Sequence, residues 1–364
     1  MKRRSKVAIF VALAFLTSCG SDPSGPTQTN QPEEPGEPEE PGGPITPPPT
    51  ETASPIFYDV TSTNLPAGLD GPSRLALYLI ALLVFAGFGF KTAAAPFHFW
   101  CPDVYQGAAT PVTAFLSIAP KAAGFAVMTR FFLSGLSRQA GGAWDLTGSI
   151  DWAPLLMLVS VVTMTLGNVA ALTQTNMKRL LAYSSIAHAG YIMMGVVALS
   201  DDGVRAMLIY LLAYIVMNLG AFLVVTLIHN SDGSFDIRDY PGLFKRAPLL
   251  AVAMGVFLLS LMGIPPFVGF MGKLYVFGAI IAKGPEYYWY AVVGALNAAI
   301  AAYYYFRILR AMVIDEDERE QPAFELALVD RVAVVALVAA NVLPLLAWRF
   351  IDEWAQRALI LYRG

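Results

Sequence analysis

Residues 249–281 read LLAVAMGVFLLSLMGIPPFVGFMGKLYVFGAII, a long apolar run that contains two adjacent prolines and one lysine. Proline has no amide hydrogen, so Pro265 and Pro266 leave two backbone carbonyls one turn earlier without their helical hydrogen bonds. Lys273 follows in the same run, and a lysine at the centre of a bilayer costs about 2.5–3.5 kcal/mol on insertion scales. We therefore expect a membrane-spanning helix that is broken near its middle and whose lysine faces protein or water.

Two other apolar runs combine a lysine with a proline. Lys91 lies shortly before Pro96, and Lys121 directly follows Pro120. Each proline frees a carbonyl of its own helix, and freed carbonyls at membrane depth are tolerated mainly where they are buried or line a wet cavity. We therefore expect helix breaks at both prolines and a path for charge that includes all three lysines. The alternative is a set of kinked packing helices whose lysines extend toward the membrane surface.

The composition predicts an all-α membrane protein with several spans. Apolar residues make up 56% of the 364 residues and charged residues 14%, and the mean hydropathy is +0.55. Helices satisfy every backbone hydrogen bond inside lipid, and long apolar runs of this kind are typical of them. About eight transmembrane helices are expected, two of them broken. They cover residues 74–99, 112–133, 153–174, 179–200, 204–229, 249–281, 287–313 and 328–350.

The first 56 residues differ from the rest of the chain. Residues 1–19 begin with basic residues, continue with an apolar stretch too short to span a membrane, and end in Leu-Thr-Ser-Cys. This ending resembles the lipobox of bacterial lipoproteins, which implies cleavage before Cys19 and lipidation of that cysteine. An ordinary cleaved signal or an uncleaved first helix is the alternative. Residues 20–56 are rich in proline and glutamate and are expected to form a disordered, acidic tether.

Charge and cysteine usage exclude several other classes. Beyond the leader and the acidic tether the chain is nearly neutral, so a basic face for nucleic acid is not expected. Cys101 is the only cysteine besides Cys19, so neither an iron–sulfur ligand set nor another metal site is expected. The predicted inside loops hold more Lys and Arg than the outside loops, which favours a chain with both termini outside. Residues 351–364 are expected to form a C-terminal tail.

Several motifs in a fixed order carry a family resemblance. They are GFGFK (87–91), PFHFW (96–100), PDVYQG (102–107), FLSIAPKAAGFAVMTR (115–130), MKRLLAYSSIAH (177–188) and GIPPFVGFMGK (263–273). Together they resemble the antiporter-like subunits of respiratory complex I, and among these most of all subunit N of bacterial NADH-quinone oxidoreductase. The resemblance runs from about residue 57 to about residue 346.

The resemblance implies a proton-translocating domain, residues 57–350, derived from two inverted five-helix repeats that each contain one broken helix. It places Lys91 in the first broken helix, Lys121 on the connecting span and Lys273 in the second broken helix. His188 is expected either to relay protons between Lys121 and Lys273 or to be a hydrogen-bonded packing group. A buried lysine can exchange a proton near neutral pH, whereas an arginine stays charged.

The sequence also departs from the family. Members begin with six further helices, and a glutamate on the fifth of these pairs with the lysine at the position of Lys91. The leader and tether stand in their place here, so the spans form a remnant of the two repeats, and Lys91 is expected to lack its partner.

Three functions are compatible with these features. The resemblance implies a non-redox membrane subunit of NADH-quinone oxidoreductase, a translocase in the bacterial inner (plasma) membrane that moves protons coupled to electron transfer. Its partners would be the lipid bilayer and the other membrane subunits of complex I, with FMN, iron–sulfur clusters and quinone held by partner subunits and no cofactor in this chain. The alternatives are a cation/proton antiporter subunit of the same superfamily and a non-functional lipoprotein fusion fragment.

Overall fold

The computed structural model describes residues 71–135, 137–140, 143–146, 152–315 and 324–359. The predicted leader, the predicted tether and the lipidation site proposed at Cys19 lie outside these residues. All described residues belong to one compact unit, residues 64–364, which is defined by its backbone contacts.

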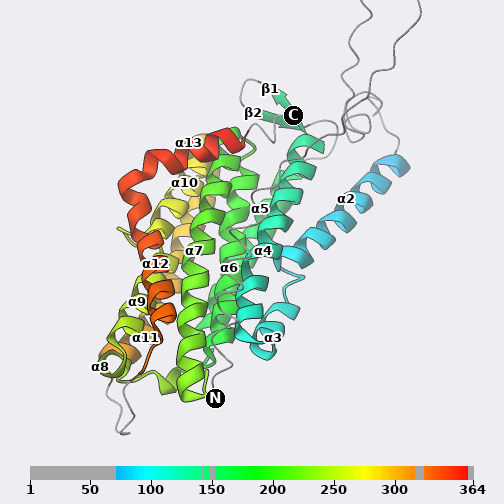
Figure 1. Cartoon of the computed structure of the whole chain (residues 1–364). Coiled ribbons are helices and arrows are strands. Elements are labelled where there is room, and N and C mark those ends of the chain that lie inside the picture. The colour runs from blue at the N-terminus through cyan, green and yellow to red at the C-terminus, as the bar shows by residue number, and fades with distance from the viewer. Residues whose placement is uncertain (1–70, 136, 141–142, 147–151, 316–323, 360–364) are drawn as a thin grey trace, which may run out of the picture. The chain divides into compact units, whose positions relative to one another are not determined.

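Helices form most of the regular structure (Figure 1). The first helices are α2 (Gly71–Thr92), α3 (Trp100–Gly107), α4 (Thr110–Thr129) with the π-helical turn η1 (Arg130–Gly135), α5 (Ala153–Leu172) and α6 (Met177–Val197). They are followed by α7 (Asp201–Asp232), the 3-10 turn η2 (Ile237–Asp239), α8 (Leu243–Arg246), α9 (Pro248–Met262), α10 (Val268–Lys283), the 3-10 turn η3 (Pro285–Tyr287), α11 (Tyr288–Val313), α12 (Leu328–Val342), the 3-10 turn η4 (Leu343–Ala347) and α13 (Trp348–Ala358). Two short strands, β1 (Ser137–Ala140) and β2 (Ala143–Leu146), form an antiparallel hairpin that the sequence pattern did not indicate.

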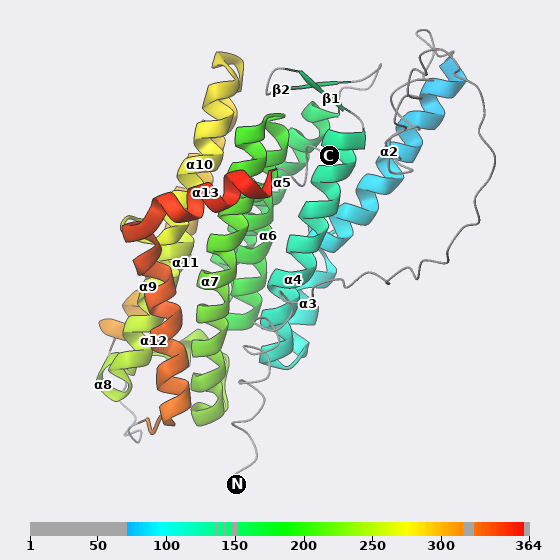
Figure 2. The same cartoon turned by 45° about the horizontal axis from the view of Figure 1, so that its top comes forward.

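Helix α6 lies at the centre of this unit. Nearly all of its residues are buried, and α3, α4, α5, α7 and α10 pack against it. Figures 1 and 2 both show α4, α5, α6 and α7 running side by side. The helix begins where the Asn176 side chain accepts a hydrogen bond from the Arg179 amide, which satisfies one of the free donors of the first turn. Central position and burial make α6 the element on which a site inside the membrane can be built.

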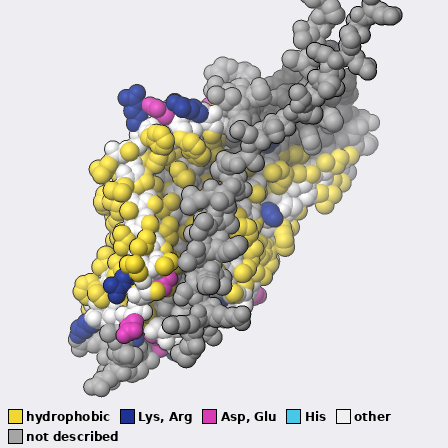
Figure 3. Space-filling view, in the orientation of Figure 1, with side chains coloured by type: hydrophobic (Ala, Val, Ile, Leu, Met, Phe, Trp, Pro, Cys, Tyr) yellow, Lys and Arg dark blue, Asp and Glu magenta, His cyan; other side chains and the backbone are white. Residues whose placement is uncertain are grey.

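The predicted all-α membrane fold is confirmed, while the exact number of spans stays a prediction. Two shorter apolar segments, Leu79–Thr92 and Pro248–Met262, each end at a helix break. Apolar side chains cover much of the described surface visible in Figure 3, and most charged side chains lie toward its upper and lower ends. Six helical segments in the described part of the chain are long and apolar enough to cross a membrane, the last of which joins α12, η4 and α13: Thr110–Leu133, Ala153–Ala171, Met177–Val197, Asp201–Asp232, Pro285–Val313 and Leu328–Ala358.

The structure interrupts its helices at two of the three expected places. Pro96 lies between α2 and α3, and Pro265 and Pro266 lie between α9 and α10. The expected break at Pro120 is wrong, because α4 continues through this residue from Thr110 to Thr129. A proline inside a helix costs about 3 kcal/mol, and α4 packs against α2, α6 and α7, which offsets that cost.

The C-terminal region also differs from the expectation. Residues 351–358, expected to belong to a tail, are part of helix α13. This helix contacts α7, and Figures 1 and 2 show that it runs across the neighbouring helices instead of along them. The chain therefore turns after α12, and α13 contacts the N-terminal end of α7.

Candidate functional site

At the helix break between α9 and α10, the free carbonyls are hydrogen-bonded by the lysine that follows, Lys273. The ammonium of Lys273 donates hydrogen bonds to the carbonyls of Leu261 and Met262, at 3.2 and 2.7 Å. These are the two carbonyls that Pro265 and Pro266 leave without helical partners. They also form the C-terminal end of α9, where the aligned peptide dipoles favour a positive charge.

Lys273 lies inside the protein and has an aromatic partner. Only 5% of the residue is exposed, and its ammonium lies over the ring of Tyr191 on α6, 4.8 Å from the ring centre. Within the described residues no Asp or Glu side chain forms an ion pair with it. Backbone carbonyls and an aromatic face therefore supply the local negative potential that a cation needs at this depth.

Lys121 reaches the same central helix from the other side. It projects from α4, is 1% exposed, and donates a hydrogen bond of 2.6 Å to the Ser185 carbonyl of α6. One turn earlier on α4, the Ser117 hydroxyl accepts a hydrogen bond from Asn218 of α7. Polar contacts of this kind hold α4 to α6 and α7 around the lysine.

His188 lies on α6 between these two contact points. Both of its ring nitrogens face tyrosine hydroxyls: Nδ1 lies 3.0 Å from Tyr210 of α7, and Nε2 lies 3.5 Å from Tyr305 of α11. The ring of Tyr214 packs against the imidazole with 5.2 Å between ring centres. The histidine is thus a buried group with a possible proton donor or acceptor at each ring nitrogen.

The three groups meet α6 at successive turns. Lys121 binds the carbonyl of Ser185, His188 follows three residues later, and Tyr191, which contacts Lys273, follows after another three. Positions three residues apart are neighbours on a helix surface, and six residues span about 9 Å of helix axis. The structure therefore brings Lys121, His188 and Lys273 into one buried line along α6.

Lys91 does not belong to this line. Lys91 is exposed at the end of α2, so the described residues do not bring all three lysines into one path. Helix α2 packs against α4 and leaves its other sides open, as the exposed Phe90 beside the lysine shows. At this break the indole nitrogen of Trp100 donates to the Phe90 carbonyl at 3.0 Å, and the same carbonyl accepts from the Ala93 amide.

Sequence reasoning missed the tyrosines around His188. Tyr191, Tyr210 and Tyr305 come from three different helices, and nothing in the local sequence connects Tyr210 or Tyr305 with the histidine. Tyr191 had a signal, because it stands three residues after His188 on an apolar helix. The Tyr305 hydroxyl also lies 2.6 Å from the Ser184 hydroxyl, so the polar cluster extends from the histidine to α11.

Two interrupted helices and a buried line of two lysines and one histidine characterise this mainly helical membrane protein. Residues 57–300 match the family described as NADH:quinone oxidoreductase/Mrp antiporter, TM, and the chain belongs to this family. It is 50% identical to the NADH-quinone oxidoreductase subunit N of Anaeromyxobacter sp. (strain Fw109-5), over 80% of this chain and 58% of the relative. The resemblance stated from the motifs is confirmed.

Solved structures agree with this assignment. A chain of respiratory complex I from Thermus thermophilus with bound aureothin is 35% identical, with a TM-score of 0.63 over 82% of this chain and 63% of that one. A chain of the Mrp complex from Dietzia sp. DQ12-45-1b has the same fold, with a TM-score of 0.70 at 21% identity over 84% of this chain and 64% of that one. The chain spans about 58% of the length of the curated relative.

Proposed function

We propose that this chain is a proton-translocating membrane subunit of an NADH-quinone oxidoreductase. The observation that carries the proposal is the placement of Lys121, His188 and Lys273 in one buried line along α6. In this proposal the chain holds no redox centre. FMN, iron–sulfur clusters and quinone belong to partner subunits, and electron transfer there drives proton movement here.

The proton path proposed within the chain runs from Lys121 through His188 to Lys273. A neutral imidazole has one N–H and one bare nitrogen, so it can accept a proton at one nitrogen and release one from the other. Tyr210 stands on the Lys273 side of the histidine, because its ring packs against Gly272, the residue before the lysine. Its hydroxyl is therefore the group through which His188 would exchange protons with the second broken helix.

Substitution of His188 tests the relay. We expect His188→Ala to lower NADH-driven proton pumping by roughly tenfold or more, because a positioned proton-transfer group contributes about 10²–10⁴-fold in enzymes. The measurement is dye-reported acidification of inverted membrane vesicles that contain the assembled complex, with complex abundance determined in parallel. The matched control is His229→Ala, which removes a histidine stacked on Phe235 near the end of α7, away from the line. Equal pumping in both variants would leave His188 a packing role only.

An antiporter subunit is the second candidate, favoured by the shared fold with the Mrp complex. The same vesicles separate the two functions. Proton release on addition of Na⁺ or K⁺ without NADH supports the antiporter, whereas NADH-dependent pumping that copurifies with the tagged chain supports the subunit of an oxidoreductase.

We further propose a multi-pass arrangement in the bacterial inner membrane with both termini outside. Arg205 near the start of α7 bonds Asp352 of α13, whereas Gly233 caps the other end of this 32-residue helix, about 42 Å from Arg205 along the helix axis. In a background with both native cysteines replaced by serine, Arg349→Cys should react with an impermeant maleimide from outside and Gly233→Cys should not. The reverse pattern would overturn the orientation.

A further inference from the structure

Helix α13 has three sides of different chemistry. Its sequence, Trp348 to Ala358, reads WRFIDEWAQRA. At about 100° per residue, the side chains fall into three sectors about 120° apart. The first sector holds Trp348, Asp352 and Ala355, the second holds Arg349, Glu353 and Gln356, and the third holds Phe350 and Trp354. The exposed Arg357 lies at the border between the second and third sectors, and Ile351 and Ala358 lie between the third and the first.

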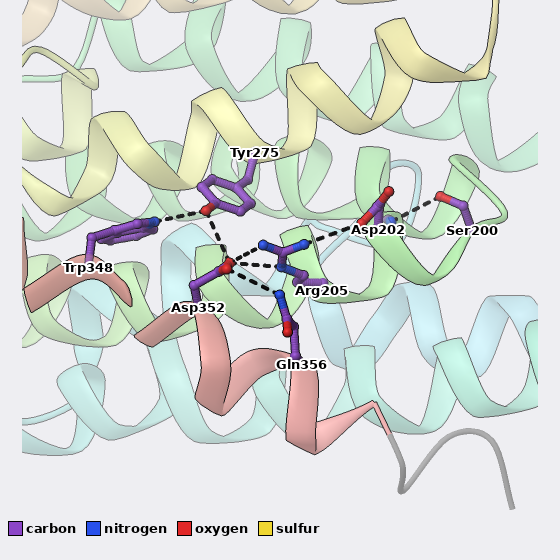
Figure 4. Close-up of polar contacts among 8 residues, drawn as sticks. Ser200, Asp202, Arg205, Tyr275, Trp348, Asp352 and Gln356 are labelled. Carbon is purple, nitrogen blue, oxygen red and sulfur yellow. Dashed lines mark hydrogen bonds and ion pairs between the residues drawn. The ribbon is translucent and has the colours of Figure 1, made fainter. Parts of the chain in front are cut away.

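The first sector is bound to the rest of the protein. Figure 4 shows the Asp352 carboxylate between Arg205 of α7 and Tyr275 of α10, and both donate hydrogen bonds to it. The Trp348 indole donates to the Tyr275 hydroxyl at 2.8 Å, and Ala355 is fully buried. This side therefore fixes α13 across the N-terminal end of α7 and the middle of α10.

The second sector carries charge that faces away from the protein. The side chain of Arg349 is 92% exposed and forms an ion pair with Glu353 one turn later. This sector holds one basic and one acidic side chain, and Arg357 at its border adds a second basic one, as expected for a surface that meets water.

The third sector is apolar and exposed. Phe350 is 75% exposed and Trp354 is 46% exposed, and they lie one turn apart on the same side. This surface continues the outer face of α12 and η4, where large apolar side chains are also exposed. They are Val332, Val335, Leu343 and Leu346.

We propose that α13 lies in the interface of the bilayer, with Phe350 and Trp354 inserted into lipid at the boundary between headgroups and acyl chains. Three arguments support lipid as the occupant of this face. The face continues the apolar surface of a membrane-spanning segment, the opposite charged sector is suited to water, and helices of this pattern lie in the interface plane. Tryptophan with its apolar ring and polar N–H is enriched at that depth.

The inference concerns the lipid contact of α13 and does not depend on proton translocation. It has one consequence for the site. Because Tyr275 is two residues from Lys273 on α10, the contacts of Asp352 connect the interfacial helix to the half-helix that carries the buried lysine.

Adjacent residues on opposite sides of α13 provide the test. In the full chain with both native cysteines replaced by serine, Phe350→Cys and Arg349→Cys are each labelled with an environment-sensitive fluorophore and reconstituted into phosphatidylcholine–phosphatidylglycerol vesicles. We expect the label at position 350 to be quenched several-fold more by spin-labelled lipid than the label at position 349, and iodide to show the reverse order. Trp354→Cys should behave as Phe350→Cys.

Two results would overturn the proposal. Equal quenching of both positions by iodide, with none by lipid, would place the whole helix in water. Protection of position 350 from both quenchers would show that protein covers this face. Folding of each variant is checked by its elution as a single species in size-exclusion chromatography in detergent.

Discussion

Lys273→Gln is expected to reduce NADH-driven proton pumping at least a hundredfold while the assembled complex remains near normal abundance. The glutamine amide can still donate hydrogen bonds toward the carbonyls of Leu261 and Met262, so the closure of the broken helix is retained. It cannot bind or release a proton. The expected loss corresponds to the lower part of the range of about 10²–10⁴-fold that proton-transfer groups contribute in enzymes.

Two further substitutions sharpen this test. Lys273→Arg keeps the charge but stays protonated, so it should also fail to pump. Lys283→Ala is the control on the same helix, because Lys283 stands at the end of α10 and donates to the Ala198 carbonyl, far from the line. It should retain most of the pumping. Normal pumping by Lys273→Gln would exclude the lysine as a proton carrier and leave it only as a cap for α9.

Helix interruptions could be predicted from the sequence where they depend on the backbone of a single residue. Proline removes a hydrogen bond wherever it stands, so the interruptions at Pro96 and at Pro265 could be predicted. Pro120 removes a bond too, but whether a helix continues past a missing bond depends on its packing against other helices. That packing cannot be deduced from α4 alone.

Which lysines are buried was less predictable, because burial also depends on packing between helices. Lys91, Lys121 and Lys273 all stand in apolar runs that contain prolines, and their local sequences do not distinguish which of them is buried. The structure buries the two that face α6 and leaves Lys91 exposed on a helix that packs mainly against α4. The tyrosines at His188 were unpredictable because helices distant in sequence bring them together.

Helix α13 shows a different kind of error. Its three-sided pattern is present in the sequence, but a predicted span that ended at residue 350 divided it. Phe350 was counted as membrane-crossing and Trp354 as part of a tail, although both belong to one helix that runs across its neighbours. The pattern becomes visible only when the turn at η4 is known.

Gly190→Ala is expected to destabilise the protein by about 2–3 kcal/mol, near the upper end of the usual cost of overpacking. The α5–α6 contact is the most extensive between helices in the described residues, and it depends on the absence of a side chain here. An added Cβ would lie 2.7 Å from the Met164 amide nitrogen and 2.8 Å from the Ser160 carbonyl oxygen of α5. These are backbone atoms, so the helices themselves would have to separate.

Separation would also weaken the polar contacts between the helices, since the Ser160 hydroxyl donates to the Gly190 carbonyl at 2.6 Å. Gly278→Ala is the matched control: an added Cβ there meets nothing within 4 Å, and alanine favours a helix interior over glycine by about 1 kcal/mol. In a Cys19→Ser background, the buried Cys101 reports unfolding by its reaction with a thiol-reactive dye on heating in detergent. Gly190→Ala should unfold several degrees below the parent chain and Gly278→Ala at or above it. The result matters for the site because α6 carries the buried line of Lys121, His188 and Lys273. Equal unfolding temperatures for the two variants would show that close contact between α5 and α6 does not hold α6 in place.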